Sequence, residues 1–579
     1  MFFRHVLLRI LSVLIPLSIL ATTYLYLYPI FHGCAFPLSY QNTSTTSTFS
    51  PALLATIREH LGFPSSPESH ADKAPFRLLV LADPQIEGDS SLPGPNNGLP
   101  QRLAWRWKRI ISAETPLDRL TWIAKSVRDV LIVDIPRSLR AVQKRLDLFG
   151  NDFYLAHIYR TLRWWTRPTH VAVLGDLIGS QWVTDNEFKV RSWRYWNRVF
   201  KGGVRVDDNI TVTGSKDFNN DIKPGLLQLD DLSWSDRVIN IAGNHDIGYA
   251  GDITEARIKR FDRDFGRANW DVRFEYLAPN SIGILPTGSR PTLHLIVLNS
   301  LSLDTPALTP SIQSQTYAFL NDAITHRSYP VEDRTSFTLL LTHLPLHKKE
   351  GVCTDAPYFS FHSEDDDKSD TGMPRFKAGG LKEQNHLSDY VSHNGILQGV
   401  FGMSGNRNAP AGGRGRNGLI LTGHDHTGCD VIHFVDRQVA KGDGGSSDDT
   451  HDWTWNAQRY SSLASPIGSP SIREVTLRSM MGEYGGYAGL LSIWFDSDPL
   501  VQEWRYEIMM CALGVQHIWW AIHTVDLIAI VTLLVYIYLC IIQPGDAVER
   551  DAPMQSGYDL KNTKSNSSEN EAKANIKRK

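Results

Sequence analysis

Two long apolar runs stand near the two ends of the chain. Residues 10–36 contain no Asp, Glu, Lys or Arg, and residues 515–542 contain one acidic residue, Asp526. Because a helix that crosses a membrane needs about 20 apolar residues, both runs predict membrane-spanning helices. A cleaved signal peptide is the alternative for the first run, but its apolar part would be only about 7–15 residues long. We therefore expect an uncleaved anchor and a second span, in which Asp526 faces a polar partner because a carboxylate is costly in lipid.

The charges beside these runs predict the orientation of the chain. Arg4 and Arg9 precede the first run, and residues 543–579 after the second run contain seven Lys and Arg. The positive-inside rule places both ends in the cytosol, as a short segment over 1–9 and a polar, disordered tail over 543–579. The region between the spans then lies across the membrane, in a lumenal or extracellular space.

That region divides into a linker over 37–75, which has a Ser/Thr-rich start, and a large domain over 76–512. Asn42 in the linker and Asn209 in the domain stand in Asn-x-Ser/Thr sequons, so both are candidate glycosylation sites on the far side of the membrane.

Short apolar runs between the spans predict buried strands, which are typically 4–8 residues long. The runs cover residues 77–82, 171–174, 238–242, 293–298, 337–342 and 418–422. Residues 88–169 instead alternate apolar and basic residues at helical spacing, so we expect a helical insertion that packs beside the site or near the membrane. Strands and helices together predict an α/β domain.

The composition excludes some classes of function. A formal net charge of -3 argues against a nucleic-acid-binding protein, which usually has a strongly basic domain. Five cysteines and no Cys-x-x-Cys pair make cysteine an improbable metal ligand. Cys353 and Cys429 each follow a polar cluster, and in an oxidising lumen they could pair; two unpaired thiols are the alternative.

Five polar blocks follow five of the six predicted strands. They are Ala82-Asp83-Pro84-Gln85, Gly175-Asp176-Leu177, Gly243-Asn244-His245-Asp246, Thr342-His343-Leu344-Pro345 and Gly423-His424-Asp425-His426. A single Gly-Asp is usually a turn and a single His is usually structural, but a series of strand-end clusters is where α/β folds place their sites. Oxygen and imidazole ligands suit manganese, iron or zinc. A pair of such ions would neutralise a phosphodiester and lower the pKa of a bound water.

In this order the blocks resemble the calcineurin-like metallophosphoesterase family. The resemblance implies a two-sheet sandwich flanked by helices, with two divalent metal ions on the loops at the strand ends. It implies that the metal ligands are Asp83 and His426 on the first ion, Asp176 between the two, and Asn244, His343 and His424 on the second. It also implies that His245 contacts the phosphate and protonates the leaving oxygen, and that Asp246 orients His245.

One position departs from the family pattern. The first block of the family is usually Asp-x-His, whereas this chain has Gln85 at the third position. An amide oxygen is a weaker ligand than imidazole, so Gln85 could coordinate weakly, act through water, or leave the place to solvent. A softer first site favours manganese.

A closer resemblance extends over most of the chain. Its motifs are Ala82-Asp-Pro-Gln85, Arg260-Phe-Asp-Arg-Asp-Phe265-Gly266, Gly423-His-Asp-His426 and Glu474-Val-Thr-Leu-Arg-Ser-Met-Met-Gly-Glu-Tyr-Gly-Gly486. With two terminal spans, these are similar to the endoplasmic-reticulum metallophosphoesterases that remodel GPI anchors, a group that includes the "cell division control" type. The segment over 474–486 could cover the site or simply form a turn.

This resemblance implies manganese-dependent removal of an ethanolamine phosphate side branch from a mannose of the GPI glycan. It implies residence in the endoplasmic-reticulum membrane, with Golgi cycling as an alternative. The implied partners are the lipid bilayer, the GPI lipid or GPI-anchored proteins as substrate, and the machinery that exports such cargo. Two further functions stay open: a phosphodiesterase for another lipid or a nucleotide, and a non-enzymatic lumenal cargo receptor with a vestigial metal site.

Overall fold

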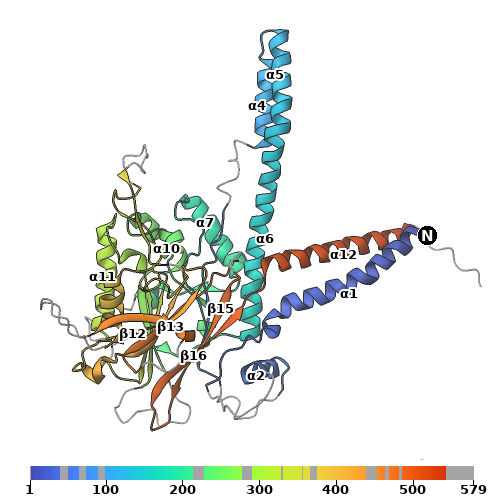
Figure 1. The fold of residues 1–579 in the computed structure, drawn as a ribbon. Coiled ribbons are helices and arrows are strands. Elements are labelled where there is room, and N and C mark those ends of the chain that lie inside the picture. The colour runs from blue at the N-terminus through green and yellow to red at the C-terminus, as the bar shows by residue number, and fades with distance from the viewer. Residues whose placement is uncertain are drawn as a thin grey trace, which may run out of the picture. The chain divides into compact units, whose positions relative to one another are not determined.

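The computed structural model describes most of the chain, and both apolar runs are included. The described residues are 2–39, 50–63, 73–88, 98–212, 227–276, 290–327, 330–354, 356–364, 375–437, 453–462, 468–481 and 485–542. The sequon at Asn42 and the polar tail over 543–579 lie outside them. The fold is mixed α/β, with two large β-sheets and helices around them (Figure 1).

The first sheet has six strands in the order β16-β15-β1-β2-β5-β3. Their bounds are β1 Phe76–Leu81, β2 His170–Val173, β3 Val204–Arg205, β5 Arg237–Asn240, β15 Tyr487–Asp496 and β16 Glu503–Ala512. The strands β1, β2 and β5 run parallel, so their carboxyl ends lie at the same edge of the sheet.

The second sheet has eight strands in the order β13-β12-β14-β11-β8-β7-β6-β4. Their bounds are β4 Leu227–Gln228, β6 Trp270–Glu275, β7 Thr292–Leu298, β8 Ser336–Thr342, β11 Asn417–Thr422, β12 Cys429–Asp436, β13 Thr454–Arg459 and β14 Ser471–Thr476. Strands β7, β8, β11 and β14 are parallel neighbours. A separate pair joins β9 Phe359–Phe361 to β10 Leu381–Gln384.

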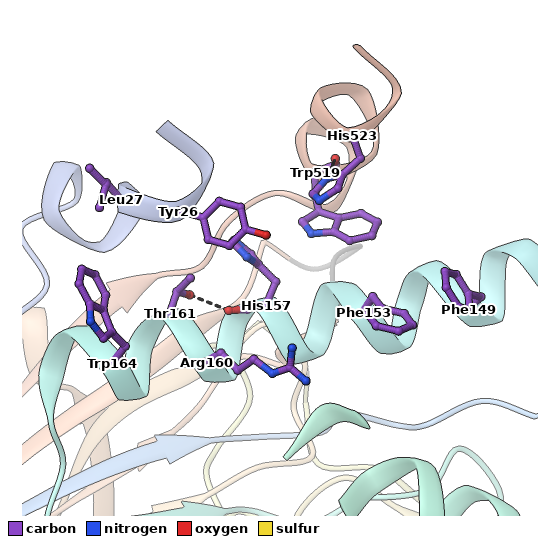
Figure 2. Close-up of a pocket in the computed structure, with 10 residues that line it drawn as sticks. All are labelled: Tyr26, Leu27, Phe149, Phe153, His157, Arg160, Thr161, Trp164, Trp519 and His523. Atoms are coloured by element: carbon purple, nitrogen blue, oxygen red, sulfur yellow. Dashed lines mark hydrogen bonds between the residues drawn. The ribbon is translucent and has the colours of Figure 1, made fainter. Parts of the chain in front are cut away.

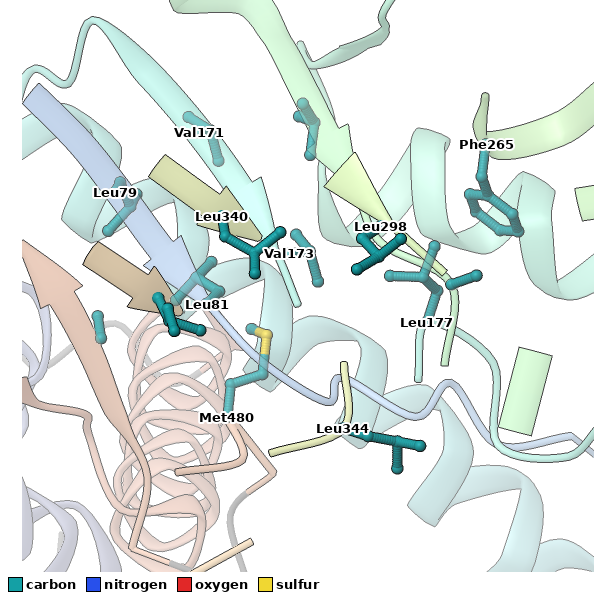
Figure 3. Close-up of a cluster of buried hydrophobic side chains, with 14 of the residues drawn as sticks. Leu79, Leu81, Val171, Val173, Leu177, Phe265, Leu298, Leu340, Leu344 and Met480 are labelled. Atoms are coloured by element: carbon teal, nitrogen blue, oxygen red, sulfur yellow. The ribbon is translucent and has the colours of Figure 1, made fainter. Parts of the chain in front are cut away.

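The alternation of side chains along β1 shows how the core is built. Leu78 and Val80 belong to one buried cluster together with residues of the second sheet such as Leu339. Leu79 and Leu81 point to the opposite face and belong to a second cluster, which Figure 3 shows. Because side chains of a strand alternate between faces, each sheet buries both of its faces.

All six apolar runs that predicted strands are strands in the structure. The strands near the carboxyl end of the domain were not predicted. In β12 the buried residues alternate with partly exposed ones, so no continuous apolar run marks it. In β15 and β16 the strands are ten residues each and mix polar with apolar side chains.

The predicted helical insertion is a set of helices, but only part of it packs in the domain. The helices are α4 Leu99–Ile111, α5 Pro116–Asp129 and α6 Ile135–Thr166, with a short π-helical segment over Val130–Asp134 that joins α5 to α6. None of the described residues of α4 is buried, and Ser126 is the one buried residue of α5. In α6 the buried residues begin at Gly150. Of the two expected positions of the insertion, beside the site or near the membrane, α4 and α5 therefore do not pack in the domain, and a position near the membrane stays a prediction for them.

Other helices cover the sheets and carry the connections. They are α2 Pro51–His60, α7 Asp185–Arg194, α8 Asp208–Val212, α9 Asn244–Ile247, α10 Glu255–Phe265 and α11 Pro310–Thr325, with a π-helical segment over Val391–Val400. The helix α2 lies inside the region expected to be a linker, and its Ala52 and Leu53 are buried. The sequon residue Asn209 lies exposed in α8.

The two apolar runs form α1 Phe2–Phe31 and α12 Gln516–Ile542, each long and apolar enough to cross a membrane. These two helices fit a membrane protein. The first helix begins eight residues earlier than the predicted span, because the apolar residues before Ile10 continue the helix, so the short segment over 1–9 is helical. It ends at Phe31, where Gly33 takes a left-handed conformation and the N–H of Cys34 donates to the carbonyl of Pro29.

The chain divides into two compact units, one made of residues 1–16 and 526–579 and the other of residues 17–525. The larger unit contains both sheets, α6 and the parts of α1 and α12 that adjoin the domain. Four of the five cysteines are paired within it, as Cys34–Cys511 and Cys353–Cys429. Of the two alternatives for Cys353 and Cys429, the structure has the bond, and the bond to Cys34 was not foreseen.

Candidate metal centre

The five polar blocks come together at one place, where the carboxyl ends of parallel strands from both sheets meet. The N–H of Gln85 after β1 donates to the carbonyl of Asp176 after β2 (2.8 Å). The N–H of Gly423 after β11 donates to the carbonyl of His343 after β8 (3.1 Å). A hydrogen bond joins the two sheets at this place. His343 Nδ1, after β8 of the second sheet, donates to the carbonyl of Leu174, after β2 of the first sheet (2.8 Å).

Glycines in three blocks allow this close approach. A Cβ atom at Gly243 would overlap the backbone and side chain of Asp176. A Cβ atom at Gly175 would overlap the ring of His343, and one at Gly423 would overlap the carbonyl of Leu174. The glycine that opens each of these blocks is therefore required by packing within the site itself.

Three of the expected ligands have positive backbone φ angles, with values of 50° at Asp83, 50° at Asp176 and 70° at His424, and Gln85 beside them has a φ of 39°. Left-handed conformations are unfavourable for residues with a Cβ and are found mainly where surrounding structure enforces them, often at functional sites. Here the enforced turns aim all three side chains into the same space.

Two buried carboxylates face each other across the site. Asp83 and Asp176 are 0% and 1% exposed. Burial and the nearby charge of Asp176 raise the pKa of Asp83 well above its usual range. Burial would also raise the pKa of Asp176, but His245, His343 and His424 together hold it below its usual value.

The rings of His343 and His424 are oriented by backbone carbonyls. Because His343 Nδ1 donates to Leu174, its Nε2 is left as the acceptor, 3.4 Å from Asp176 Oδ1. His424 Nε2 lies 3.0 Å from the carbonyl of Gln384, so its Nδ1 faces the site. Such carbonyl contacts fix which nitrogen of an imidazole can hold a metal. Burial lowers the pKa of His424 to about 3, which keeps the ring neutral.

Asn244 lies between these two rings. Its Oδ1 is 2.9 Å from His343 Nε2 and 3.0 Å from His424 Nδ1. The amide oxygen and the two imidazole nitrogens therefore point to one position, as expected for the second metal ion of the predicted site.

Gln85 lies beside the first group of expected ligands. Its Nε2 donates to Asp176 Oδ2 (3.1 Å) and lies 3.0 Å from His426 Nε2. The side chain of Gln85 therefore contacts residues of one candidate ligand group, Asp176 and His426. Burial lowers the pKa of His426, so this ring is neutral as well.

His245 stands at the edge of the site. Its backbone N–H donates to Asp176 Oδ1 (2.8 Å), and its Nε2 lies 3.8 Å from Asp176 Oδ2. The side chain is 37% exposed, unlike the buried ligands around it. This exposure leaves the imidazole accessible to a molecule that enters the site.

The expected contact between Asp246 and His245 is not among the hydrogen bonds of the described residues. The carboxylate of Asp246 is fully buried and accepts backbone N–H groups from Gly243 (2.8 Å), Leu177 (3.1 Å) and Ile178 (2.8 Å). Asp246 therefore ties the third block to the second through the backbone. It supports the turn that carries His245, and no hydrogen bond among the described residues joins it to the ring.

The arrangement fits metal ions in two overlapping groups of ligand atoms. Asp176, His343 and His424 form one group, and Asp83, Asp176 and His426 form the other, with the ligand atoms of each group within 4.8 Å of one another. Asp83 Oδ2 is buried and has no hydrogen-bond partner among the described residues. A buried carboxylate oxygen without a donor is costly unless a cation is bound, so the donor set fits a pair of divalent ions.

A cavity of about 520 Å³ opens over this group. His245, Asn244 and Asp176 lie at its base, and its walls carry both charges and aromatic rings, namely Lys382, Glu383, Trp182, Tyr249 and Tyr358. The size is typical of a small-molecule site, which is about 300–1,000 Å³.

The segment after Val475 touches the first block. Ser479 Oγ donates to the carbonyl of Asp83 (2.8 Å), and the N–H of Met480 donates to the carbonyl of Ala82 (2.8 Å). This segment therefore holds the turn that presents Asp83. The glycine-rich end of the motif is only partly described, since residues 482–484 lie outside the described ranges.

A buried ion cluster nearby escaped the sequence analysis. Glu474 accepts from Lys348 Nζ (2.9 Å), His433 Nε2 (2.7 Å) and the backbone N–H of Leu346 (2.8 Å). All three side chains are 0–1% exposed. The three residues lie far apart in the sequence and in no common motif, so no local pattern could have joined them.

Comparison with known proteins adds relatives but no named family. No family model matches the chain. Protein TED1 of Saccharomyces cerevisiae is 29% identical over 544 residues, which cover 87% of this chain and 93% of that protein. An uncharacterized protein of Schizosaccharomyces pombe is 26% identical over 412 residues, which cover 67% of this chain and 81% of that protein. The similarity thus extends over most of the chain and is not confined to the polar blocks.

Among solved structures, the chain aligns with GAP50, the anchor in the inner membrane complex of Plasmodium. The alignment covers 76% of this chain and 89% of that chain, with 9% sequence identity and a TM-score of 0.26. A score this low says nothing about the fold or function of this chain.

Proposed function

We propose that this chain is a phosphodiesterase of the calcineurin-like metallophosphoesterase type that uses two divalent metal ions. The observation that carries the proposal is Asp176, which belongs to both candidate ligand groups and so can bridge two ions. Asp83 and His426 would hold the first ion, with Gln85 beside it. Asn244, His343 and His424 would hold the second. Manganese is the preferred metal, with zinc or iron as alternatives, because all ligands are oxygen or imidazole nitrogen.

Two such ions neutralise an anionic diester and supply a nucleophile at neutral pH. The protein side chains provide the rest of the chemistry. His245, exposed at the base of the cavity, donates a proton to the oxygen of the leaving group. Asp176 holds the backbone of His245, and Asp246 holds the turn that carries it, so the imidazole is fixed relative to the ligands. A receptor that only bound cargo would need no proton donor at this place.

The preferred substrate is an ethanolamine phosphate branch on a mannose of a GPI anchor. The resemblance over the motifs of residues 82–85, 260–266, 423–426 and 474–486 supports this choice. The cavity offers groups for both ends of the branch: Lys382 for the phosphate, and Glu383 with Tyr358 for the ammonium group. A phosphodiester without an ammonium group would leave Glu383 and Tyr358 unused.

The proposed location is the lumenal side of the endoplasmic-reticulum membrane, where removal of the branch would aid export of GPI-anchored cargo. Two helices that can span a membrane support an anchored enzyme. The disulfides Cys34–Cys511 and Cys353–Cys429 support an oxidising compartment for the domain, because disulfides rarely persist in the cytosol.

Mass spectrometry of GPI glycans from cells that lack this protein tests the proposal. We expect the side-branch ethanolamine phosphate to accumulate, and the wild-type chain but not His245→Ala or Asp176→Asn to remove it. Asp207→Asn is a matched control, because Asp207 is exposed and lies outside the cavity. Unchanged glycans in the cells that lack the protein would overturn the substrate assignment.

A second experiment separates the reaction from the substrate. The purified full-length chain should hydrolyse bis(p-nitrophenyl) phosphate when Mn²⁺ is added, and Asp176→Asn should reduce the rate by about 10³-fold or more, since the bridging ligand is lost. Hydrolysis of this diester with unchanged GPI glycans would leave a phosphodiesterase of another lipid or nucleotide. Equal rates for the wild type and Asp176→Asn would exclude a metal-dependent enzyme.

A further inference from the structure

A second cavity lies far from the polar blocks in the sequence, between the end of α1, the middle of α6 and the start of α12. Its volume is about 520 Å³. Figure 2 shows the ten residues that line it, which are Tyr26, Leu27, Phe149, Phe153, His157, Arg160, Thr161, Trp164, Trp519 and His523. All ten belong to the larger unit of the chain.

The walls of this cavity are held by specific contacts. His157 Nε2 donates to the carbonyl of Leu25 (3.1 Å), which joins α6 to α1. Tyr154 OH donates to the carbonyl of Gly514 (2.6 Å), which joins α6 to the segment just before α12. At Gly150 of α6, the ring of Trp520 occupies the space that a side chain would need. The cavity is therefore a built feature of the junction.

The cavity lies at the level where the two apolar helices meet the domain. Tyr26 and Leu27 are in the last two turns of α1, which ends at Phe31, and Trp519 and His523 are in the first two turns of α12. If α1 and α12 cross a membrane, this level is the boundary between hydrocarbon and water. Tyr and Trp are enriched at that boundary because their rings are apolar at one end and polar at the other.

The lining is aromatic and unusually exposed. Tyr26 is 48% exposed, Phe149 is 54% exposed and Trp164 is 52% exposed. Leaving three large rings in water around one cavity is unfavourable, at roughly 25 cal/mol for each Å² of apolar surface. An acyl chain of a surrounding lipid would cover these rings at the same depth in the membrane.

One cation stands among the rings. Arg160 is exposed, and its Nη2 donates to the carbonyl of Arg198 (3.3 Å). No carboxylate of the described residues forms an ion pair with Arg160. The neighbouring cations of the same region are paired, Arg163 with Asp236 and Arg198 with Asp152. Arg160 therefore offers a positive charge to an anion at the mouth of an apolar cavity.

We propose that the cavity between α1, α6 and α12 binds a glycerophospholipid of the surrounding leaflet. The acyl chain lies against Phe149, Phe153 and Trp519, and the phosphodiester lies at the guanidinium of Arg160. This site is separate from the metal centre and does not depend on the proposed phosphodiesterase activity. Its occupant is a lipid rather than a protein segment, since the cavity combines one anion-binding group with a wall suited to a flexible chain.

Photo-crosslinking tests this proposal on the full-length chain. The protein is placed in bilayer discs of phosphatidylcholine that contain a phosphatidylcholine with a diazirine in its acyl chain, irradiated, and digested. We expect labelled peptides from α6 residues 149–164 and from the start of α12. Trp164→Ala and Arg160→Glu should each reduce this labelling about fivefold to tenfold, which corresponds to the loss of one good contact.

The matched controls are Trp193→Ala and Lys189→Glu. Trp193 and Lys189 are exposed residues of α7 that do not line the cavity, so labelling should stay at the wild-type level. All four substitutions are at exposed positions, and equal thermal unfolding of the variants will show that they fold.

Three results would overturn the proposal. They are labelling of the variants equal to that of the wild type, labelling confined to the parts of α1 and α12 outside the cavity, and crosslinks to another protein in place of lipid. Because none of these readouts measures hydrolysis, their failure leaves the proposed phosphodiesterase activity untouched.

Discussion

Gln85 Nε2 lies 3.0 Å from Nε2 of His426 and donates to Asp176, the carboxylate that belongs to both candidate ligand groups. An amide binds a divalent ion more weakly than an imidazole does. The amide of Gln85 can still occupy the space beside the candidate ion and hold the side chains of Asp176 and His426. We predict that Gln85→His raises the affinity for Mn²⁺ and that Gln85→Ala lowers it by about 10-fold to 100-fold, as for other residues that support metal ligands. Isothermal titration with Mn²⁺ on the metal-free protein measures both.

The control for this prediction is Gln313→Ala. Gln313 donates to backbone carbonyls at Leu303 and Asp304, outside the metal centre. Its substitution should leave Mn²⁺ affinity unchanged. An affinity of Gln85→Ala equal to that of the wild type would show that Gln85 takes no part in the site and that solvent fills the position.

The absence of a side chain at Gly243 is a second requirement of the site. We predict that Gly243→Ala lowers the free energy of unfolding by about 1–3 kcal/mol, because the added methyl group would overlap the backbone of Asp176 and force the second block to move. It should also reduce hydrolysis by more than the loss of stability alone would cause, since Asp176 belongs to both candidate ligand groups. Urea denaturation and diester hydrolysis measure the two effects.

A glycine in open space provides the comparison. A Cβ atom at Gly468 would meet nothing within 4 Å, so Gly468→Ala should change neither stability nor hydrolysis. If Gly243→Ala were as stable and active as Gly468→Ala, the close approach of the second and third blocks would not matter to the site.

The sequence predicted which residues meet at the candidate metal centre better than it predicted the rest of the fold, and the reason is local. Each ligand follows an apolar run in a block of two to four residues, so both the strand and its polar end are visible in one short window. The groups that orient the ligand side chains could not be predicted in this way. The carbonyl of Gln384 orients His424, and that of Leu174 orients His343, and a carbonyl has no signature in the sequence.

Contacts between segments that lie far apart in the chain could not be predicted from the sequence either. The bond between Cys34 and Cys511 spans 477 residues, and nothing beside either cysteine indicates its partner. The strand β12 was not predicted because its apolar residues are interrupted by polar ones, and in β15 and β16 polar residues such as Ser492, Arg505 and Glu507 divide the apolar residues into shorter runs. The carboxylate of Asp246 accepts backbone N–H groups, and these contacts could not be predicted because residues that are neighbours in sequence can point apart.

The disulfides give a prediction about the redox state of the compartment that contains the domain. We expect that, in intact microsomes without a reductant, a membrane-permeant maleimide labels Cys540 alone, because the other four cysteines are paired. Labelling of Cys353 or Cys429 in the wild type would show that the domain does not lie in an oxidising compartment.

The replacement of Cys34 and Cys511 together by serine should lower the free energy of unfolding by about 2–4 kcal/mol.

The buried cluster around Glu474 predicts how stability depends on pH. The surrounding Lys348 and His433 overcome the effect of burial and hold the pKa of Glu474 well below its ordinary value of 4.5. A carboxylate with a depressed pKa stabilises the fold fully above the unfolded pKa and loses this contribution as the pH falls below it. We predict that Glu474→Gln lowers the free energy of unfolding by about 3–5 kcal/mol at pH 7, because it leaves Lys348 buried without a counter-charge. The difference from the wild type should narrow below about pH 4.3, where the unfolded carboxyl takes up its proton.

Urea denaturation of both proteins at pH 7 and at several lower pH values measures this difference. The control is Glu255→Gln, because Glu255 pairs with Lys259 on the surface of α10, where both side chains are exposed and the pair is worth little. Its stability should follow that of the wild type within about 0.5 kcal/mol at every pH. A difference between Glu474→Gln and the wild type that stays constant from pH 7 to pH 3 would mean that the cluster acts through packing alone. The substitution would then destabilise the fold through a loss of packing and not through a loss of charge. Lys348 would have to donate to another acceptor in place of the carboxylate.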